Sequence, residues 1–550
     1  MFDYVIVGGG SAGAVLAARL SEDPEIKVCL LEAGGEGRSL LVRVPAGAAA
    51  TVPGYAASVN WAFETEAQPA LNGRRGYQPR GRGLGGSSSI NTMLYVRGHR
   101  ADYDEWARLG CTGWSYTDVH PYFLKAEANQ RGSSEYHGAG GPLPVADAIW
   151  ARPINADFLA AAARQGIARN DDFNGPEQEG AGLFQVTQFW QGPKAGERAS
   201  TAAAYLHPAM GRRNLTVVAG AMVTHVEFEG RRARRVCYRQ GRRLHTVGAG
   251  REIILCAGAL QSPQLLMLSG IGPAEHIRAN GIEVVADVPE VGANLQDHLD
   301  FAVTYRSTNR NLVGIGAHAA FALALAAGQW HRDGTGHLRT TISESGAFVK
   351  TDPTLDRPDI QLHFLVAMAD DHGRSLHRGY GYSCHACVLR PHSRGEVRLE
   401  SRDPLAEPLI NPRFLSDPRD LCTLVKGAKI ARSIMEAQPL ARHRLDELYP
   451  VSGLDDEALA EEVRSRADTI YHPAGTCRMG GDQQSVVDPQ LRVRGVEGLR
   501  VVDASVMPRL IGGNTNAPVV MIAEKAADLV RQARARGEFG AVPADRAEPA

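Results

Sequence analysis

The sequence predicts an α/β protein with a second unit of the α+β class, and three observations lead to this prediction. A strand, a glycine-rich turn, a helix and a second strand follow one another at the N-terminus. Alternating polar and apolar runs, such as IQLHFLV and GEVRLES, are typical of strands in a half-buried antiparallel sheet. With 550 residues, the chain is also long enough to form more than one hydrophobic core.

The N-terminal pattern predicts a Rossmann-like unit that binds a dinucleotide. Residues 3–7 form a short apolar run that leads into the GxGxxG motif at 8–13. In such a motif Gly8 permits the tight turn, Gly10 lets a pyrophosphate approach the backbone, and Gly13 lets helix and strand pack closely. The second strand ends at Glu32, 19 residues after Gly13, where an acid can bind a ribose hydroxyl. These residues leave NAD and FAD open.

Composition excludes some classes of function. The formal net charge is −1, with 60 basic and 61 acidic residues, so no global field favours nucleic acid. The N-terminus lacks the basic and apolar segments of a signal peptide. Of the eight cysteines only Cys384 and Cys387 form a CxxC pair, and no second pair accompanies it, so no metal site is predicted. We expect reduced thiols and a cytoplasmic protein.

Residues 313–330 are nearly all apolar but contain three glycines and His318. The segment is marginal for a membrane-spanning helix. The simpler interpretation is a buried or cavity-lining helix. The alternative is a helix that contacts a partner or the inner face of a membrane as a peripheral anchor.

Further motifs narrow the class. Residues 81–98 read GRGLGGSSSINTMLYVRG, residues 258–272 read GALQSPQLLMLSGIG, and the C-terminal part contains LRVVDASVMPRL and GGNTNAPVVMIAEKAADLV. With these motifs the sequence resembles the glucose–methanol–choline (GMC) family of FAD-dependent alcohol oxidoreductases, from about residue 2 to about residue 532. The stretches NWAFETEAQPALNGR, VGANLQDHLD and DTIYHPAGTCRMG resemble the branch of bacterial aliphatic and polyethylene glycol alcohol dehydrogenases.

The resemblance implies FAD as the cofactor and assigns it a set of contacts. Gly8, Gly10, Gly13 and Glu32 would hold the ADP half, and Asn91 with the backbone of its two successors would lie along the flavin edge. Further contacts are implied for Ser11, Ala12, Ala33, Trp61, Arg82, Gly85, Gly86, Thr92, Met93, Val223 (at the adenine), Ala257, Asp503 and Ala504 (at the pyrophosphate), and Asn516. Some relatives attach FAD covalently through a histidine where this chain has Ile90, so we expect noncovalent FAD.

His472, in YHPAGTCRMG, is the candidate catalytic base. Oxidation of an alcohol needs a group that takes the hydroxyl proton while the flavin takes the hydride at N5, and a neutral imidazole can do so. The resemblance assigns this role to His472. It also implies that Asn516, 44 residues later, donates a hydrogen bond to the developing alkoxide.

The motif positions also predict the domains. A discontinuous FAD-binding domain would comprise residues 1–150, 200–305 and 485–535, and residues 151–199 and 306–484 would form a substrate domain on an antiparallel sheet flanked by helices. Residues 536–550 would be a flexible tail. Among other polar residues, we expect His298 to pack or position, His363 to be a cavity or core histidine, and Glu344 to be able to pair with a substrate cation.

The expected reaction is oxidation of a primary alcohol, aliphatic, aromatic or a glycol, to an aldehyde. The partners would be the small alcohol and an electron acceptor: a quinone, a carrier protein or oxygen. The alternative is a choline dehydrogenase or oxidase, which needs a site for a cation, usually an aromatic cage. A flavin-binding protein without turnover and a hydroxynitrile lyase are further alternatives from other classes.

Overall fold

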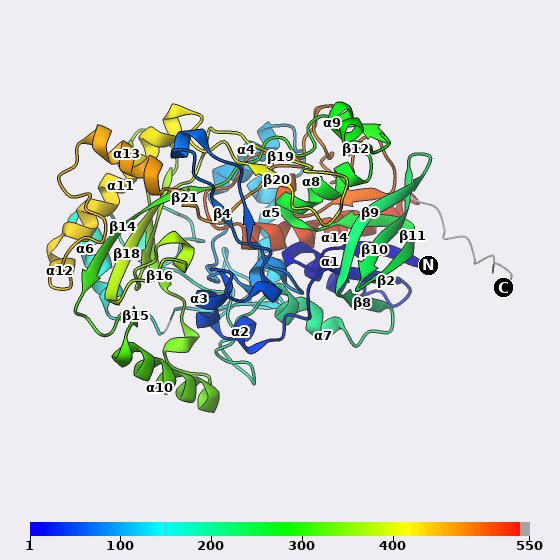
Figure 1. The fold of residues 1–550 in the computed structure, drawn as a ribbon. Coiled ribbons are helices and arrows are strands. Elements are labelled where there is room, and N and C mark those ends of the chain that lie inside the picture. The colour runs from blue at the N-terminus through cyan, green and yellow to red at the C-terminus, as the bar shows by residue number, and fades with distance from the viewer. Residues whose placement is uncertain (149, 539–550) are drawn as a thin grey trace.

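The computed structural model describes residues 1–148 and 150–538. Two large sheets, each with its own helices, form the two halves of the molecule (Figure 1). One contains the N-terminal strands and the other contains strands from the second half of the chain.

The first sheet confirms the Rossmann-like prediction. Its strands run in the order β8-β2-β1-β11-β10-β9, and β22 pairs with β11. Strands β8, β2, β1, β11 and β22 pair in parallel, and β9, β10 and β11 form an antiparallel meander. The strands are β1 (Phe2–Val7), β2 (Val28–Glu32), β8 (Leu215–Ala219), β9 (Ala221–Glu229), β10 (Arg232–Gln240), β11 (Arg243–Leu255) and β22 (Leu499–Val501).

Two helices far apart in the sequence pack against each other beside this sheet. Helix α1 (Ser11–Leu20) follows the glycine motif, and α14 (Asn516–Ala535) is the last helix described. The Arg19 guanidinium donates two hydrogen bonds of 2.8 and 2.9 Å to the buried Glu524 carboxylate, which joins the two helices. The first unit is therefore completed by residues from the far end of the sequence, as Figure 1 shows by colour.

The second sheet is antiparallel, as predicted. Its strands run in the order β21-β14-β18-β17-β16-β7, and β15 pairs with β18. They are β7 (Gly180–Leu183), β14 (Leu299–Ser307), β15 (Gly314–Ile315), β16 (Ser343–Val349), β17 (Ile360–Leu365), β18 (Gly379–Val388) and β21 (Asp468–Thr469).

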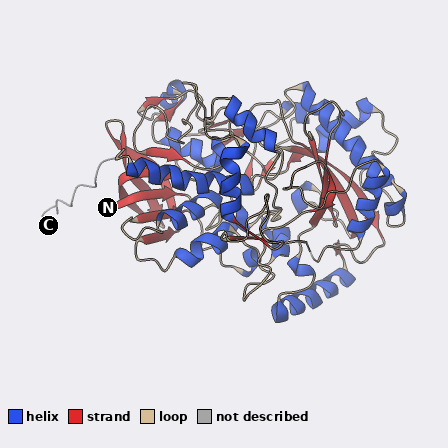
Figure 2. Ribbon diagram, turned by 180° about the vertical axis from the view of Figure 1, so that it is seen from behind, coloured by secondary structure: helices blue, strands red, loops and turns tan. Residues whose placement is uncertain are grey.

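The alternation of side chains gives this sheet two different faces. One face buries apolar residues such as Phe301, Leu362 and Phe364 in a core. Helices cover this face on the outside of the molecule (Figure 2): α6 (Ile154–Arg164), α11 (Pro418–Glu436), α12 (Gln438–Ala441) and α13 (Asp456–Arg466). The opposite face carries Asp300, Ala302, Thr304, His363 and His385 toward the centre of the molecule, where they line a cavity.

Smaller elements connect the two units. The remaining helices are α2 (Leu40–Arg43), α3 (Ala48–Thr51), α4 (Arg100–Arg108), α5 (Tyr116–Ala126), α7 (His207–Ala209), α8 (Gly258–Leu268), α9 (Ala274–Ala279) and α10 (Ala317–Asp333). The remaining strands are β3 (Phe63–Glu64), β4 (Tyr77–Gln78), β5 (Glu127–Asn129), β6 (Leu143–Val145), β12 (Ile271–Gly272), β13 (Ala286–Asp287), β19 (Glu396–Arg398) and β20 (Leu409–Asn411).

Two of the predicted domain boundaries differ from the structure. The boundary at 305/306 cuts β14, which pairs with β18 from Asp300 to Ser307 and therefore belongs to the second sheet. The boundary at 484/485 separates Ala474, Cys477 and Met479 from the first core, in which they are buried. Of the predicted tail at 536–550, residues 539–550 lie outside the described part.

Candidate active site

A single cavity of about 1530 Å³ runs from the glycine motif of the first unit to the polar face of the second sheet. It exceeds the ~300–1,000 Å³ of ordinary small-ligand pockets. Most residues predicted to contact the cofactor line it: Gly8, Gly10, Ser11, Ala12, Glu32, Ala33, Trp61, Gly86, Asn91, Thr92, Met93, Val223, Ala257, Asp503, Ala504 and Asn516.

Three of the predicted contact residues lie behind this lining. A Cβ atom on Gly13 would stand 1.9 Å from the Gly8 carbonyl oxygen, so Gly13 serves the close packing of helix on strand. The Gly85 amide donates to the Gly9 carbonyl oxygen at 2.7 Å. Arg82 places its guanidinium carbon 4.7 Å from the centre of the Trp61 ring, so it supports a cavity residue rather than lining the cavity itself.

The glycine motif forms a site suited to a pyrophosphate. Helix α1 starts at Ser11 with no acidic residue in its first turn, and its first N–H groups have no intrahelical partner. Gly10 and Gly86 line the cavity without side chains, and a Cβ atom on Gly86 would come within 2.7 Å of Gly10 Cα. Backbone amides and the positive end of the helix dipole therefore face the cavity, which fits the phosphates of FAD.

Glu32 fixes the loops around this site. Its carboxylate accepts hydrogen bonds from the amides of Gly9 and Gly34, both at 2.8 Å, and from Gly83 at 3.0 Å. Burial raises the pKa of Glu32 despite these donors. The ribose contact predicted for Glu32 would use the acceptor capacity that remains, since a carboxylate has about four lone-pair sites.

Asp503 has a similar role at the other end of the motif set. Its carboxylate accepts hydrogen bonds from Ser262 Oγ at 2.6 Å and from the amides of Gly258 and Ser505, both at 2.8 Å. These bonds join the loop after β22 to the start of α8. Asp503 thus shapes the cavity wall next to the predicted pyrophosphate position.

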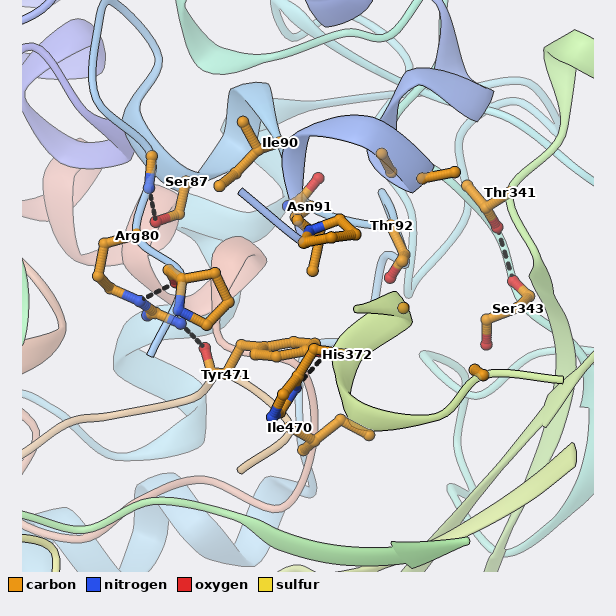
Figure 3. A pocket seen from close by; sticks show the side chains of 18 of the residues that line it. Arg80, Ser87, Ile90, Asn91, Thr92, Thr341, Ser343, His372, Ile470 and Tyr471 are labelled. Carbon is orange, nitrogen blue, oxygen red and sulfur yellow. Dashed lines mark hydrogen bonds between the residues drawn. The ribbon is translucent and has the colours of Figure 1, made fainter. Parts of the chain in front are cut away.

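The serine-rich loop forms one wall of the inner cavity. Figure 3 shows Ile90, Asn91 and Thr92 on this wall, facing Ile470 and Tyr471. Asn91 Oδ1 accepts hydrogen bonds from the Met93 amide at 3.0 Å and from the Arg198 guanidinium at 2.9 Å. Ile90 offers no nucleophilic atom with which a flavin could bond.

His472 lies in a firmly held loop across from that wall. Its amide donates to Asp297 Oδ1 at 2.9 Å, and Arg80 donates to the carbonyl oxygen of Tyr471 at 2.9 Å. Tyr471 has a φ of +77°, a left-handed conformation that is costly for a bulky residue. Burial raises the pKa of Asp297 to about 6. The loop therefore holds the imidazole of His472 in one orientation at the cavity surface.

The His472 ring is held neutral. Burial lowers its pKa well below the usual value, and the neighbouring His298, His363 and Arg80 add to that effect. A neutral imidazole has one nitrogen with a free lone pair, so the ring can accept a proton.

The asparagine next to His472 is not the predicted one. Asn514 Nδ2 lies 3.3 Å from His472 Nε2, whereas Asn516 Oδ1 accepts a hydrogen bond of 3.0 Å from Ser11 Oγ in the glycine motif. Asn516 is the first residue of α14, and its side chain faces the predicted cofactor site. The structure thus joins His472 with Asn514 and leaves Asn516 to the cofactor side.

The polar face of the second sheet supplies the far wall of the cavity. His385 Nδ1 and Asp300 Oδ2 are 2.5 Å apart. His363, opposite His385 in the β17–β18 ladder, is buried with no hydrogen-bond partner on either ring nitrogen, and burial lowers its pKa to about 3. It is a cavity histidine. Glu344 is instead held by the Arg152 amide at 2.7 Å and Asn155 Nδ2 at 2.6 Å, and it does not line the cavity.

One group of potential metal ligands occurs in the described residues. Ligand atoms of His225, Glu227 and Cys237, on β9 and β10, lie within 4.8 Å of one another. The Glu227 carboxylate already accepts hydrogen bonds from Arg235 Nε at 2.8 Å and from Cys237 Sγ at 3.2 Å. These contacts account for the group without a metal ion.

The glycine motif on a parallel sheet, the large cavity and the neutral His472 ring opposite the Asn91 loop fit an FAD-dependent oxidoreductase. Sequence models of the GMC oxidoreductases match residues 2–300 and 391–523. The chain belongs to the GMC family, as its motifs predicted, and is an FAD-dependent enzyme of the alcohol dehydrogenase type.

Characterised relatives cover nearly the whole chain. It is 46% identical to an alcohol dehydrogenase [acceptor] of Pseudomonas putida over 96% of each protein. It is 43% identical to the mitochondrial choline dehydrogenase of Homo sapiens, over 96% of this chain and 90% of that protein. Among solved structures, pyridoxine 4-oxidase from Mesorbium loti superposes with a TM-score of 0.86 at 34% identity, over 97% of this chain and 99% of that one.

Proposed function

We propose that the protein oxidises primary alcohols, aliphatic, aromatic or glycols, to aldehydes. The O–H bond breaks as its proton moves to Nε2 of His472, and the C–H bond breaks as its electron pair leaves with the hydrogen. Bound FAD would supply the hydride acceptor, and the electrons would then go to a quinone or another carrier. The observation that carries this proposal is the neutral His472 ring beside the Asn514 amide at the cavity surface.

Asn514 complements His472, because it can donate a hydrogen bond where His472 accepts a proton. Its Nδ2 group donates hydrogen bonds and cannot take a proton at working pH, so it can stabilise a developing alkoxide without competing with His472. It also borders the cavity that contains the Asn91 wall. A hydroxyl oxygen located between the imidazole and the amide would therefore meet a base and a donor.

Choline oxidation is the second candidate, and Asp300 supports it. This carboxylate lines the cavity and is an available counter-charge for an ammonium group. His385, however, already engages it at 2.5 Å. Among the described residues, the aromatic side chains that line the cavity are those of Trp61, Tyr380, Tyr449 and Tyr471. Each of these rings packs against a different neighbour, and no two of them pack against each other as in a cage. We therefore favour the neutral alcohols.

Anaerobic flavin bleaching separates these candidates. The purified protein would be mixed in turn with 1-butanol, benzyl alcohol, a glycol and choline while the visible flavin band is followed. We expect rapid bleaching by the neutral alcohols and none by choline. Bleaching by choline alone would establish the second candidate, and a flavin that no alcohol bleaches would contradict both. A quinone and oxygen added to the reduced enzyme then identify the acceptor.

We also propose that α10 touches a lipid surface. None of the helices in residues 1–148 and 150–538 is long and apolar enough to cross a membrane. Helix α10 projects from the molecule (Figure 1), and Phe321 and Leu325 are 64% and 60% exposed. Residues 313–331 contain no acidic side chain, and Arg310 and Arg332 lie on either side of them. Other residues of the helix, among them Ala319, line the cavity, so a lipid-dissolved alcohol or quinone would have a short path to it.

Liposome flotation tests this contact. The wild-type protein should float with vesicles that contain anionic phosphatidylglycerol, and Phe321→Glu with Leu325→Glu should abolish flotation. Leu244→Glu is the matched control, because Leu244 is 75% exposed on the distant β11. If the α10 variant still floats with the vesicles, the proposal is contradicted. It is also contradicted if the wild-type protein forms a concentration-dependent dimer that the α10 variant does not form, because α10 would then be a protein–protein contact.

A further inference from the structure

The His472 ring has a second partner, His298, whose arrangement has chemical consequences. His298 is fully buried just before β14. The two rings meet edge to face, with centres 5.1 Å apart and an interplanar angle of 90°. Their Nδ1 atoms are 2.9 Å apart. Two nitrogens at this distance must share one hydrogen, so one Nδ1 donates and the other accepts.

The backbone decides which ring donates. His298 Nε2 lies 3.1 Å from the carbonyl oxygen of Leu389. A carbonyl oxygen only accepts, so Nε2 of His298 carries a hydrogen. Burial lowers the pKa of His298 to about 3, so this ring is neutral and has only that one N–H hydrogen. Its Nδ1 is therefore an acceptor.

The state of His472 follows from this. Its Nδ1 must carry the hydrogen that is donated to His298, and its Nε2 is then the nitrogen with the free lone pair. Nε2 faces the Asn514 amide at 3.3 Å. Gln361 Nε2 donates to Asn514 Oδ1 at 3.1 Å, and this turns the NH₂ group of Asn514 toward the ring. The contacts on both sides of the His472 ring are therefore consistent with the same tautomer, the one protonated at Nδ1.

We propose that His298 is a positioning residue that fixes the reactive tautomer of His472, and that Gln361 completes the arrangement through Asn514. The inference rests on the proposed role of His472 as base. When Nε2 takes the hydroxyl proton, the ring becomes a cation that donates a stronger, charge-assisted hydrogen bond to His298. A neutral histidine occupies the place that a carboxylate holds in a Ser-His-Asp triad, so no buried charge raises the basicity of His472 in the resting enzyme.

Two amide substitutions separate the functions of the two His298 nitrogens. In His298→Asn, Oδ1 replaces the acceptor Nδ1. In His298→Gln, the longer amide can reach the Leu389 carbonyl but leaves no acceptor beside His472. We expect anaerobic flavin reduction to fall on the order of 10²-fold in His298→Gln and to stay within about tenfold of wild type in His298→Asn. Equal rates in His298→Gln and wild type would overturn the inference.

The pH profile distinguishes positioning from simple structural support. The groups that face His472 are Asp297, Arg80, His363 and Asn514, and all remain in both variants. His298 itself faces Leu389, Ile511, Arg390 and Asp102. The acceptor stabilises the protonated ring of His472, so its loss in His298→Gln should lower the pKa of His472 further and move the acid limb of the reduction rate to lower pH. An unchanged acid limb, with only FAD content and melting temperature lowered, would show a structural role alone.

A measurement on the wild-type holoenzyme remains decisive if a variant does not fold. With ¹⁵N-labelled histidine, the NMR spectrum should contain a neutral ring protonated at Nδ1 that disappears in His472→Ala. A ring protonated at Nε2 that disappears in its place would overturn the inference. A different result would contradict the proposed function: no alcohol would bleach the flavin of the wild-type enzyme, whichever tautomer His472 has.

Discussion

Two asparagines in one short motif, Asn514 and Asn516, have different partners, and we propose that the first acts in the chemistry and the second in cofactor binding. Asn514 Nδ2 faces His472, and Asn516 Oδ1 faces Ser11. We expect Asn514→Ala to lower the rate of flavin reduction about 10²–10³-fold with unchanged FAD content, because a donor to the developing alkoxide is lost. Asn516→Ala should instead weaken FAD binding. Stopped-flow reduction and the flavin-to-protein absorbance ratio check both, and a reversed pattern would restore Asn516 as the catalytic partner.

Removal of the base gives a larger effect. His472→Ala should reduce the rate of flavin reduction about 10²–10⁴-fold while FAD remains bound, because the imidazole proposed to take the hydroxyl proton is lost. Rapid mixing under anaerobic conditions measures this rate. The matched control is His276→Ala, on α9, outside the cavity lining. An undiminished rate in His472→Ala would remove this residue from the mechanism.

At this scale the sequence predicted the residue types better than the individual positions. His472 stands out because a His–Pro pair in a run broken by two glycines indicates an ordered loop. Asn514 and Asn516 share one motif, and the start of α14 decides between them: Asn514 lies in the loop before the helix, whereas Asn516 is the first helical residue. The pairs His298–His472 and Gln361–Asn514 join distant segments, and no local pattern indicates such contacts.

Among the elements, the turn between β1 and α1 is tightly constrained by sterics. A Cβ atom on Gly13 would lie 1.9 Å from the Gly8 carbonyl oxygen, whereas one on Gly35 would meet nothing within 4 Å. We expect Gly13→Ala to abolish FAD binding or folding and Gly35→Ala to leave both within error of wild type. Flavin content and thermal unfolding measure the difference. Normal FAD content in Gly13→Ala would contradict the predicted close approach of helix and strand.

Sequence periodicity predicted the elements well where neighbouring residues decide the structure. The β1–glycine–α1–β2 unit is local, and so its glycines and Glu32 lie where the pattern placed them. The second sheet was predicted from alternation in single strands, but which strands pair depends on the whole fold. Helix α10 is the opposite case. Its apolar sequence is equally compatible with a core, and only the structure shows that all but Ala326 stay at least partly exposed.

The burial of His472 within the whole molecule determines the pH range over which the proposed base can accept a proton. Because burial holds the pKa of His472 well below 6.5, the ring is in its basic form at neutral pH and remains so into acid. The rate of flavin reduction should therefore keep its plateau below pH 6.5 and fall only as the pH approaches the lowered pKa. Pre-steady-state rates measured across the acid range check this. A fall centred near 6.5 would mean that the base is an ordinary, solvated histidine.

The division into two units was predictable, but its boundaries were not. Motifs at the start, middle and end of the sequence indicated a discontinuous first unit. The predicted boundaries were wrong at strand β14 and at residues 474–479. Strand pairing and core packing depend on contacts between distant residues, and a local sequence motif does not contain that information. The same limit applies to the cavity, whose walls come from both units.

The joining of α1 to α14 also bears on the order of events during synthesis. A nascent chain that has emerged only to residue 498 has β1, α1 and the glycine motif but lacks β22, Asp503, Asn514 and the glutamate that Arg19 binds. Its cofactor cavity is open on one side, and its base has no asparagine beside it. The cavity that fits FAD and the pairing of His472 with Asn514 are therefore both completed by the last segment of the chain to be translated.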